Sequence, residues 1–221
     1  MMGSTTTFLQ VIQKNKEAVA KQTGVELSAV GATTGKGFTA LQAGQIEIAL
    51  SADTLENLVA TAAKKGTVIA AADYEEVFLK DSYLVVIANK LNASPKLSEA
   101  QIRGILTGEI KSWSEVGGGE KPIAIFFEKE ESANFSLIKN KLLKDGVLTK
   151  RLSSVDNVRL VASNVGEVES AFGISPEMYL NDQVKILSDY KIGQHLCLII
   201  RKDASANVKQ VAEAFKAVAN K

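Results

Sequence analysis

The sequence is poor in the residues that most often carry out chemistry. Among 221 residues there is one cysteine, Cys197, and one histidine, His195. A disulfide within the chain is therefore excluded, and the spaced cysteines and histidines of a zinc site are missing. The Gly-x-Ser-x-Gly elbow that precedes a Ser-His-Asp triad is missing too. We predict no metal site and no catalytic role for His195, and we interpret Cys197 as a small buried side chain of a strand.

Excess charge and long apolar runs are also lacking. The formal net charge is +1, with 26 basic and 25 acidic residues, which argues against a nucleic-acid partner. No apolar run approaches the ~20 residues that cross a bilayer, and no secretory signal is visible. Hydrophobic residues make up 46% and charged residues 23% of the chain, which is typical of a globular protein.

Segments of strand-like and helix-like periodicity alternate along the chain. The strand-like segments are 25–30, 46–50, 74–79, 83–89, 123–127, 184–187 and 196–200. The helix-like segments are 8–24, 38–44, 54–66, 97–108, 132–143, 165–172 and 205–220. This alternation predicts an α/β fold with mostly parallel sheets and crossover helices.

The alternating segments form two blocks, which predict two lobes. We place the first lobe at 1–81 plus 190–221 and the second at 82–189. The chain then crosses between the lobes twice, and segments 80–90 and 188–196 are predicted hinges.

Hydroxyl side chains gather where three helices are predicted to begin, in "GSTTTF", "TTGKGF" and "ESANF", and Ser51 follows a strand. Helix N-termini carry unpaired N–H groups and a partial positive charge, and several converging ends can hold an oxyanion. One hydroxyl is enough to cap a helix, so the run from Ser4 to Thr7 exceeds that need. The alternative is that each turn is a helix cap and nothing more.

A phosphate-binding P-loop is excluded for "GATTGKG" by its spacing. That motif requires four residues between its glycines and a Ser or Thr after the Lys. Three residues separate Gly31 from Gly35, and Gly37 follows Lys36.

Taken as a spaced set, these motifs resemble the phosphate-binding proteins that serve bacterial ABC importers. "GSTTTF" is similar to that family's opening Gly-Ser-Thr-Thr loop, "TTGKGFTAL" to its Ser-Gly-x-Gly turn, and "GQIEIALSADTL" to a strand and the loop after it. The longest match is "LVVIANKLNASPKLSEAQIRGILTGEIKSWSEVGG". The resemblance covers residues 3–143 well and the remainder loosely. Trp113 lies in this stretch, and we interpret it as structural.

The resemblance implies a two-lobed periplasmic-binding-protein-like α/β fold with a ligand cleft between the lobes. It implies no enzymatic activity and no cofactor, a small anionic ligand such as phosphate or another oxyanion, and a membrane permease of an ABC importer as partner. It also implies a monomer located in the periplasm or otherwise outside the cytoplasm, whose signal peptide would have been removed. The ligand contacts carried over are Ser4, Thr5, Thr6, Thr7, Thr34, Gly35, Ser51, Ser132 and Asn134.

The sequence departs from the family where phosphate should be held. Glu128 stands about where the family has an Arg, and Ala52 takes the place of a carboxylate. The only arginines, Arg103, Arg151, Arg159 and Arg201, lie in no candidate loop, although Arg grips phosphate best. We therefore predict weak phosphate binding. Alternatively the acids around Glu128 face solvent, and Lys36 or Lys129 supplies the positive charge.

Two other functions are compatible with the fold. A sensory or regulatory module would use the same ligand-binding scaffold, because fold alone does not determine function. An enzyme of phosphate-ester chemistry is a weaker alternative. The opening "MM" is too short for the strand expected before the first loop, so we expect that the natural N-terminus has been trimmed.

Overall fold

The computed structural model describes residues 1–64, 66, 68–128, 133–156 and 158–219, which form two compact units of mixed α/β structure. The first unit comprises Met1–Ser82 and Gln194–Lys221, and the second comprises Tyr83–Gly193. The predicted α/β class is confirmed. The chain passes between the units within the two predicted hinge segments, and bending at those segments stays a prediction.

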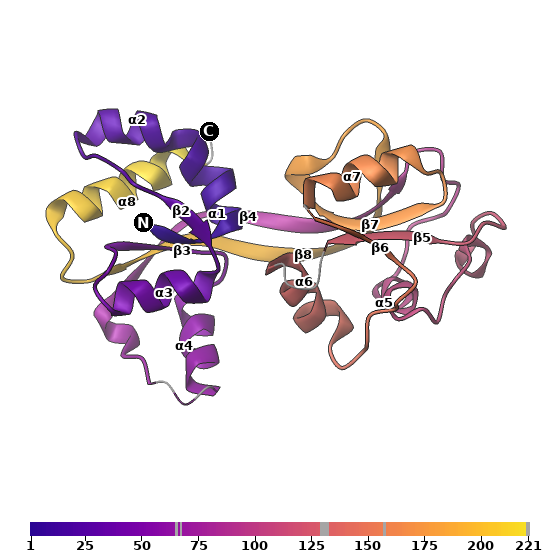
Figure 1. Ribbon diagram of the computed structural model, residues 1–221, viewed down its shortest axis with the longest axis horizontal. Coiled ribbons are helices and arrows are strands. Elements are labelled where there is room, and N and C mark those ends of the chain that lie inside the picture. The colour runs from indigo at the N-terminus through magenta and orange to yellow at the C-terminus, as the bar shows by residue number, and fades with distance from the viewer. Residues whose placement is uncertain (65, 67, 129–132, 157, 220–221) are drawn as a thin grey trace. The chain divides into compact units, whose positions relative to one another are not determined.

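The first unit contains three short strands, two long ones that it shares with the second unit, and the helices that cover them (Figure 1). Its elements are β1 (Met2–Ser4), α1 (Thr5–Thr7), a π-helical turn (Phe8–Ile12), α2 (Gln13–Thr23), β2 (Val30–Ala32), α3 (Thr34–Gln42), β3 (Ile48–Ser51), α4 (Leu55–Lys64), a 3-10 turn (Ala71–Asp73), part of β4 (Tyr74–Asn89), part of β8 (Val184–Arg201) and α8 (Ala206–Val218). The strand order is β2-β1-β3-β8-β4.

Alternating side chains of these strands build two apolar layers, one on each face of the sheet. Leu196, Leu198 and Ile200 of β8 pack with helices α2 and α8 on one face. Cys197 and Ile199 point the other way, toward α3 and α4. Figure 1 shows these helix pairs on opposite sides of the strands. Successive side chains of a strand point to opposite faces, so these alternating residues bury both faces of the sheet.

Two glycines allow α3 and β3 to lie directly against β1. Gly3 has φ +146°, and a Cβ there would lie 2.8 Å from the backbone N of Leu50. A Cβ on Gly37 would lie 2.7 Å from the Cα of Gly3. Because backbone cannot move away as a flexible side chain can, both positions require glycine, and the start of α3 is fixed beside the end of β1.

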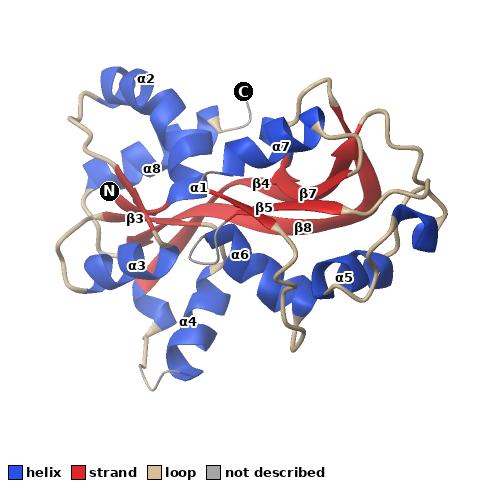
Figure 2. Ribbon diagram, turned by 45° about the vertical axis from the view of Figure 1, so that its right-hand side comes forward, coloured by secondary structure: helices blue, strands red, loops and turns tan. Residues whose placement is uncertain are grey.

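The second unit has the strand order β4-β7-β5-β6 with helices on both faces. Figure 2 shows its strands in red between helices α5, α6 and α7. Its remaining elements are α5 (Glu99–Thr107), a 3-10 turn (Trp113–Val116), β5 (Ala124–Glu128), α6 (Ala133–Ile138), a π-helical turn (Lys139–Leu143), β6 (Ser153–Val155), α7 (Val158–Glu167), β7 (Ala171–Pro176) and a 3-10 turn (Glu177–Tyr179).

Two local predictions in the second unit are confirmed. Ser98 and Gln101 form a capping box at the start of α5, and Gly108 ends this helix in the left-handed conformation. Trp113 is 1% exposed, and its indole N–H donates to the Ser170 carbonyl at 2.8 Å. Its ring therefore anchors a loop to the core, as a structural tryptophan does.

Replacing Ser98 by alanine is expected to lower the free energy of unfolding by about 1 kcal/mol, because the Gln101 N–H loses its acceptor. Urea denaturation followed by circular dichroism measures this change. Ser98→Asp serves as the control, since aspartate also caps helices and should retain most of the stability. Equal losses in both variants would mean that the cap contributes nothing.

Several predicted boundaries are wrong. Segment 165–172 is not a helix of its own, because α7 ends at Glu167 and Phe172 already lies in β7. Segments 74–79 and 83–89 form one strand, as do 184–187 and 196–200. Polar residues interrupt the apolar pattern within these long strands, but the backbone continues through them.

Two predictions near the N-terminus are also wrong. The opening residues do form a strand, since Met2–Ser4 pairs with β2 on one side and β3 on the other. Segment 25–30 is a strand only at its last residue. Val25 and Leu27 still pack against the core, which explains the strand-like pattern without strand pairing. The predicted parallel pairing holds for β1 with β2 and β3, whereas β8 runs antiparallel to β3.

Candidate functional site

Three parallel strands of the first unit end at one edge of the sheet, and helices begin there. The strands end at Ser4, Ala32 and Ser51. Helix α1 begins directly after β1, and α3 begins at Thr34, two residues after β2. In open α/β sheets, ligands bind outside the carboxyl ends of the strands. The predicted residues Ser4 to Thr7, Thr34, Gly35 and Ser51 are therefore brought together at this edge.

The opening run of hydroxyls is largely engaged within the protein. Ser4 caps the helix by accepting the N–H of Thr7 at 3.2 Å. The Thr5 hydroxyl donates to the Ala32 carbonyl at 3.0 Å, and the Thr7 hydroxyl donates to the Ser51 carbonyl at 2.6 Å. The Thr6 hydroxyl makes no hydrogen bond to other described residues. Most of the surplus hydroxyls thus join the three strand ends by hydrogen bonds, and Thr6 keeps a donor that no described residue uses.

The loop after β3 is held in a similar way. The Ala52 N–H donates to the Thr34 hydroxyl oxygen at 3.2 Å. Ser51 donates to the Asp53 carbonyl at 2.5 Å and accepts the Asp53 N–H at 3.0 Å. Ser51 is 1% exposed. Its hydroxyl therefore closes a turn, and Thr34 still has its hydroxyl hydrogen to donate.

The groups left for a ligand at this edge are donors without an ionised partner. They are the Thr6 and Thr34 hydroxyls and those first-turn N–H groups of α1 and α3 that remain after Ser4 caps the Thr7 N–H and Thr33 caps the Lys36 N–H. Gly35 is exposed in the first turn of α3, and a Cβ there would meet nothing within 4 Å. Lys36 is exposed and makes no ion pair with any described residue. This set suits a small anion.

The second unit holds the other predicted contacts. The Asn134 side-chain N–H donates to the Glu128 carboxylate at 2.9 Å, while the Asn134 amide oxygen is buried without a hydrogen-bond partner among the described residues. The Glu128 carboxylate and the Asn134 amide oxygen are acceptors, and one bond to Glu128 leaves a second N–H on the Asn134 amide. Ser132 and Lys129 lie outside the described residues. Whether Asn134 contacts ligand stays a prediction.

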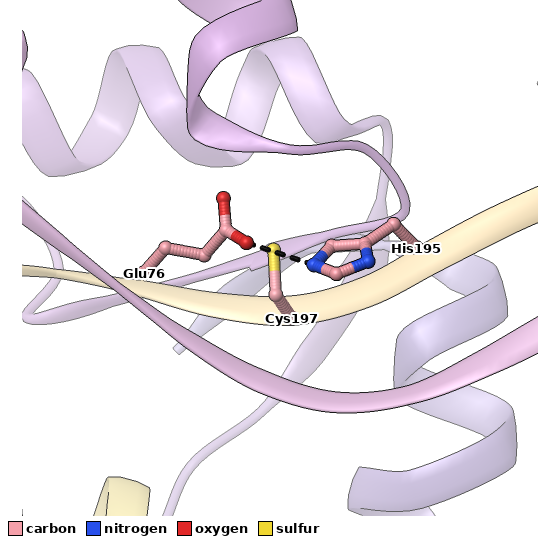
Figure 3. A group of neighbouring side chains, drawn as sticks. All are labelled: Glu76, His195 and Cys197. Carbon is pink, nitrogen blue, oxygen red and sulfur yellow. Dashed lines mark hydrogen bonds and ion pairs between the residues drawn. The ribbon is translucent and has the colours of Figure 1, made fainter.

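The structure also gathers residues that the sequence did not single out together. Glu76 of β4 lies beside His195 and Cys197 of β8, and their candidate ligand atoms are within 4.8 Å of one another (Figure 3). The spacing of His195 and Cys197 places both on one face of a strand, which was a usable signal. Glu76 carries no such signal, because it is 119 residues away from His195 in the sequence.

A separate pocket of about 440 Å³ lies at the amino ends of the same strands. It is lined by the strand starts Met2, Val30 and Ile48, by further apolar side chains, and by the polar side chains Ser28, Gln45, Asn207, Glu26 and Glu47. None of the predicted contact residues borders it. The two carboxylates in this lining disfavour an anion, so the candidate site remains at the carboxyl edge. None of the described helices has the length and apolar character needed to span a membrane.

Comparison with known proteins confirms the predicted resemblance. The phosphate-binding protein PstS of Borreliella burgdorferi is 26% identical over 102 residues, which make up 46% of this chain and 36% of that protein. The chain thus matches only about a third of that relative's length. An ABC-type phosphate transport receptor from Vibrio cholerae has the same fold, with a TM-score of 0.78 and 18% identity over 98% of this chain and 92% of the receptor.

The same fold also occurs outside transport proteins. The full-length LTTR LysG of Corynebacterium glutamicum with the bound effector Arg has a TM-score of 0.62 and 14% identity, covering 99% of this chain and 67% of that one. A family model described as a PBP superfamily domain matches residues 1–218. The chain therefore belongs to the PBP superfamily.

Proposed function

We propose that this protein is the solute-binding subunit of an ABC-type importer and that it binds a small oxyanion. The observation that carries the proposal is the carboxyl edge of the first unit, where the ends of β1, β2 and β3 are joined by hydroxyl-to-backbone hydrogen bonds. The helix starts at this edge leave N–H groups and the Thr6 and Thr34 hydroxyls for a ligand. The similarity to PstS and to a phosphate transport receptor supports the ligand class.

A binding role fits these groups better than catalysis. Across the described residues of this edge, no hydroxyl is hydrogen-bonded to a histidine or carboxylate that would activate it. A nucleophile needs such a base. The proposal accordingly includes a permease as partner and a location outside the cytoplasm, where importer subunits of this class meet their solutes.

We further propose that phosphate is bound more weakly than in family members that have an arginine about where Glu128 stands. The carboxylate of Glu128 and the amide oxygen of Asn134 are acceptors, and a carboxylate repels an oxyanion, especially where water is excluded. A ligand with a polar or cationic part would satisfy them better. The alternative is an oxyanion other than phosphate.

A thermal-shift screen over phosphate, sulfate and small carboxylate metabolites tests the anion site. At least one anion is expected to raise the melting temperature, because a ligand of the native state stabilises it by mass action. In Thr6→Val the affinity for that anion should fall about tenfold, since a hydrogen bond to a charged group is lost. Thr39→Val is the matched control, because Thr39 is exposed in the middle of α3. Equal affinities in both variants would reject this edge as the site.

A sensory module is the second candidate function, favoured by the likeness to an effector-bound LTTR. The two functions predict different partners for the loaded protein. A permease and an ATPase encoded beside the gene, with ligand-dependent uptake into vesicles that contain them, support import. A neighbouring kinase whose activity changes with ligand supports sensing instead.

A further inference from the structure

A cluster of three different metal-binding side chains lies in the first unit, within the strands rather than in its loops. Glu76 comes from β4, and His195 and Cys197 come from the same face of β8 (Figure 3). One carboxylate oxygen, one imidazole nitrogen and the thiol sulfur are all within 4.8 Å of one another. None of these residues belongs to the proposed anion site.

We propose that Glu76, His195 and Cys197 bind a divalent transition metal of borderline softness, of which Zn²⁺ is the representative. One thiolate, one imidazole and one carboxylate are the ligands that such ions take in proteins. The ligand atoms are Oε1 of Glu76, Nε2 of His195 and Sγ of Cys197. A water from solvent completes the four ligands.

The orientation of the three side chains supports this assignment. His195 Nε2 and Glu76 Oε1 face each other at 2.8 Å, and in Figure 3 the sulfur of Cys197 lies beside that hydrogen bond. The other carboxylate oxygen of Glu76 accepts the Leu55 N–H at 2.5 Å. Glu76 is therefore held in place at one oxygen and presents the other to the cluster.

The surroundings of the His195 ring are those of a metal ligand. Metal-bound histidines usually donate their second ring N–H to a carboxylate. Asp81 Oδ1 lies 3.6 Å from His195 Nδ1, and the Phe78 ring stacks on the imidazole at 4.6 Å. When Nε2 binds the ion, the ring proton moves to Nδ1, on the side of the ring that faces the Asp81 carboxylate.

Metal binding requires two small adjustments. Ligand atoms around a tetrahedral zinc lie roughly 3.3 to 3.8 Å apart, so the widest separation in the cluster must shrink by about 1 Å. Burial raises the pKa of the Cys197 thiol, and the Glu76 carboxylate adds to the rise. The ion displaces that thiol proton to solvent and replaces the contact of the sulfur with the Asp53 carbonyl at 3.3 Å.

An entry path exists on one side of the cluster. Cys197 is fully buried, while the side chains of His195 and Glu76 are 31% and 25% exposed. An ion therefore meets the imidazole and carboxylate first and the sulfur last. The same burial argues against Cys197 as a nucleophile, because its thiol is kept protonated.

Cobalt binding tests the proposal directly. Protein purified without a polyhistidine tag, reduced and freed of metal with a chelator, is titrated with Co²⁺ and then with Zn²⁺. One equivalent of Co²⁺ should produce a thiolate-to-cobalt charge-transfer band that Zn²⁺ removes. Cys197 is the only cysteine, so this band reports one side chain. Absence of the band, or its persistence in Cys197→Ser, would overturn the proposal.

Variants at His195 and Glu76 test the site without replacing the buried Cys197, whose substitution could unfold the protein. His195→Gln and Glu76→Gln should each weaken Co²⁺ binding at least tenfold. Asp81→Asn removes the carboxylate next to the imidazole ring and should weaken Co²⁺ binding about tenfold. Glu177→Gln is the control, since Glu177 forms an exposed ion pair with Lys191 in the other unit. Circular dichroism confirms that each variant is folded. Unchanged affinity in His195→Gln or Glu76→Gln would show that Glu76 and His195 are only a hydrogen-bonded pair beside a core cysteine.

Discussion

Replacing Gly37 by alanine is expected to lower the free energy of unfolding by about 2 to 3 kcal/mol, the usual cost of forcing a methyl group into close-packed surroundings. The added Cβ would lie 2.7 Å from the Cα of Gly3. Since this neighbour is the backbone of a central strand, α3 must move away from β1. That shift would also misplace Thr34 and Gly35, so anion binding should weaken together with stability.

Gly35→Ala is the matched control for this prediction, because it makes the same chemical change in the first turn of the same helix. A Cβ at Gly35 meets nothing within 4 Å, so its stability should stay the same or rise by about 0.5 to 1 kcal/mol. Denaturant unfolding of the two variants side by side measures the difference. Equal stabilities would contradict the close approach of α3 and β1.

Exchanging Glu128 for arginine is expected to strengthen phosphate binding roughly 10- to 100-fold, because a repelling carboxylate is replaced by a bidentate cation. Glu128 ends β5, about where the resemblance places the family's arginine, and its present partner is the Asn134 amide. Removing this carboxylate also frees the Asn134 N–H groups to donate to an anion. Calorimetric titration of both proteins with phosphate measures the ratio of affinities.

The control for charge alone is Asp182→Arg, which changes the net charge equally at an exposed loop position of the same unit. It should leave the affinity within a factor of about two, since exposed charges are screened by salt over roughly 8 to 10 Å. If both variants bind phosphate equally well, the gain is a general charge effect and residue 128 faces solvent.

Much of the fold could be predicted because the helix caps and the apolar periodicity of the sequence indicate the same elements. The capping box at Ser98 and Gln101, the left-handed Gly108 and the apolar face of α8 each follow from short-range rules. The long strands could not be predicted at full length. Residues such as Lys80 and Asp81 break the apolar pattern, and only pairing with a neighbouring strand keeps the chain extended there.

The candidate site was predictable in position but not in its hydrogen bonding. The run from Ser4 to Thr7 marks the edge of the sheet, yet the sequence could not show that Thr5 and Thr7 donate to carbonyls of other strands. Those partners are 27 and 44 residues away. Glu76 escaped prediction as a neighbour of His195 and Cys197 for the same reason, since it is 119 residues away from His195 in the sequence.

The affinity of the unmodified protein for phosphate at neutral pH tests the account most directly. Isothermal titration calorimetry on protein freed of bound ligand gives the dissociation constant without a label. We predict that phosphate binds with a dissociation constant above the micromolar range, while another oxyanion from the screen binds more tightly. A sub-micromolar dissociation constant for phosphate would contradict the account, because the carboxylate at position 128 would then not oppose the anion.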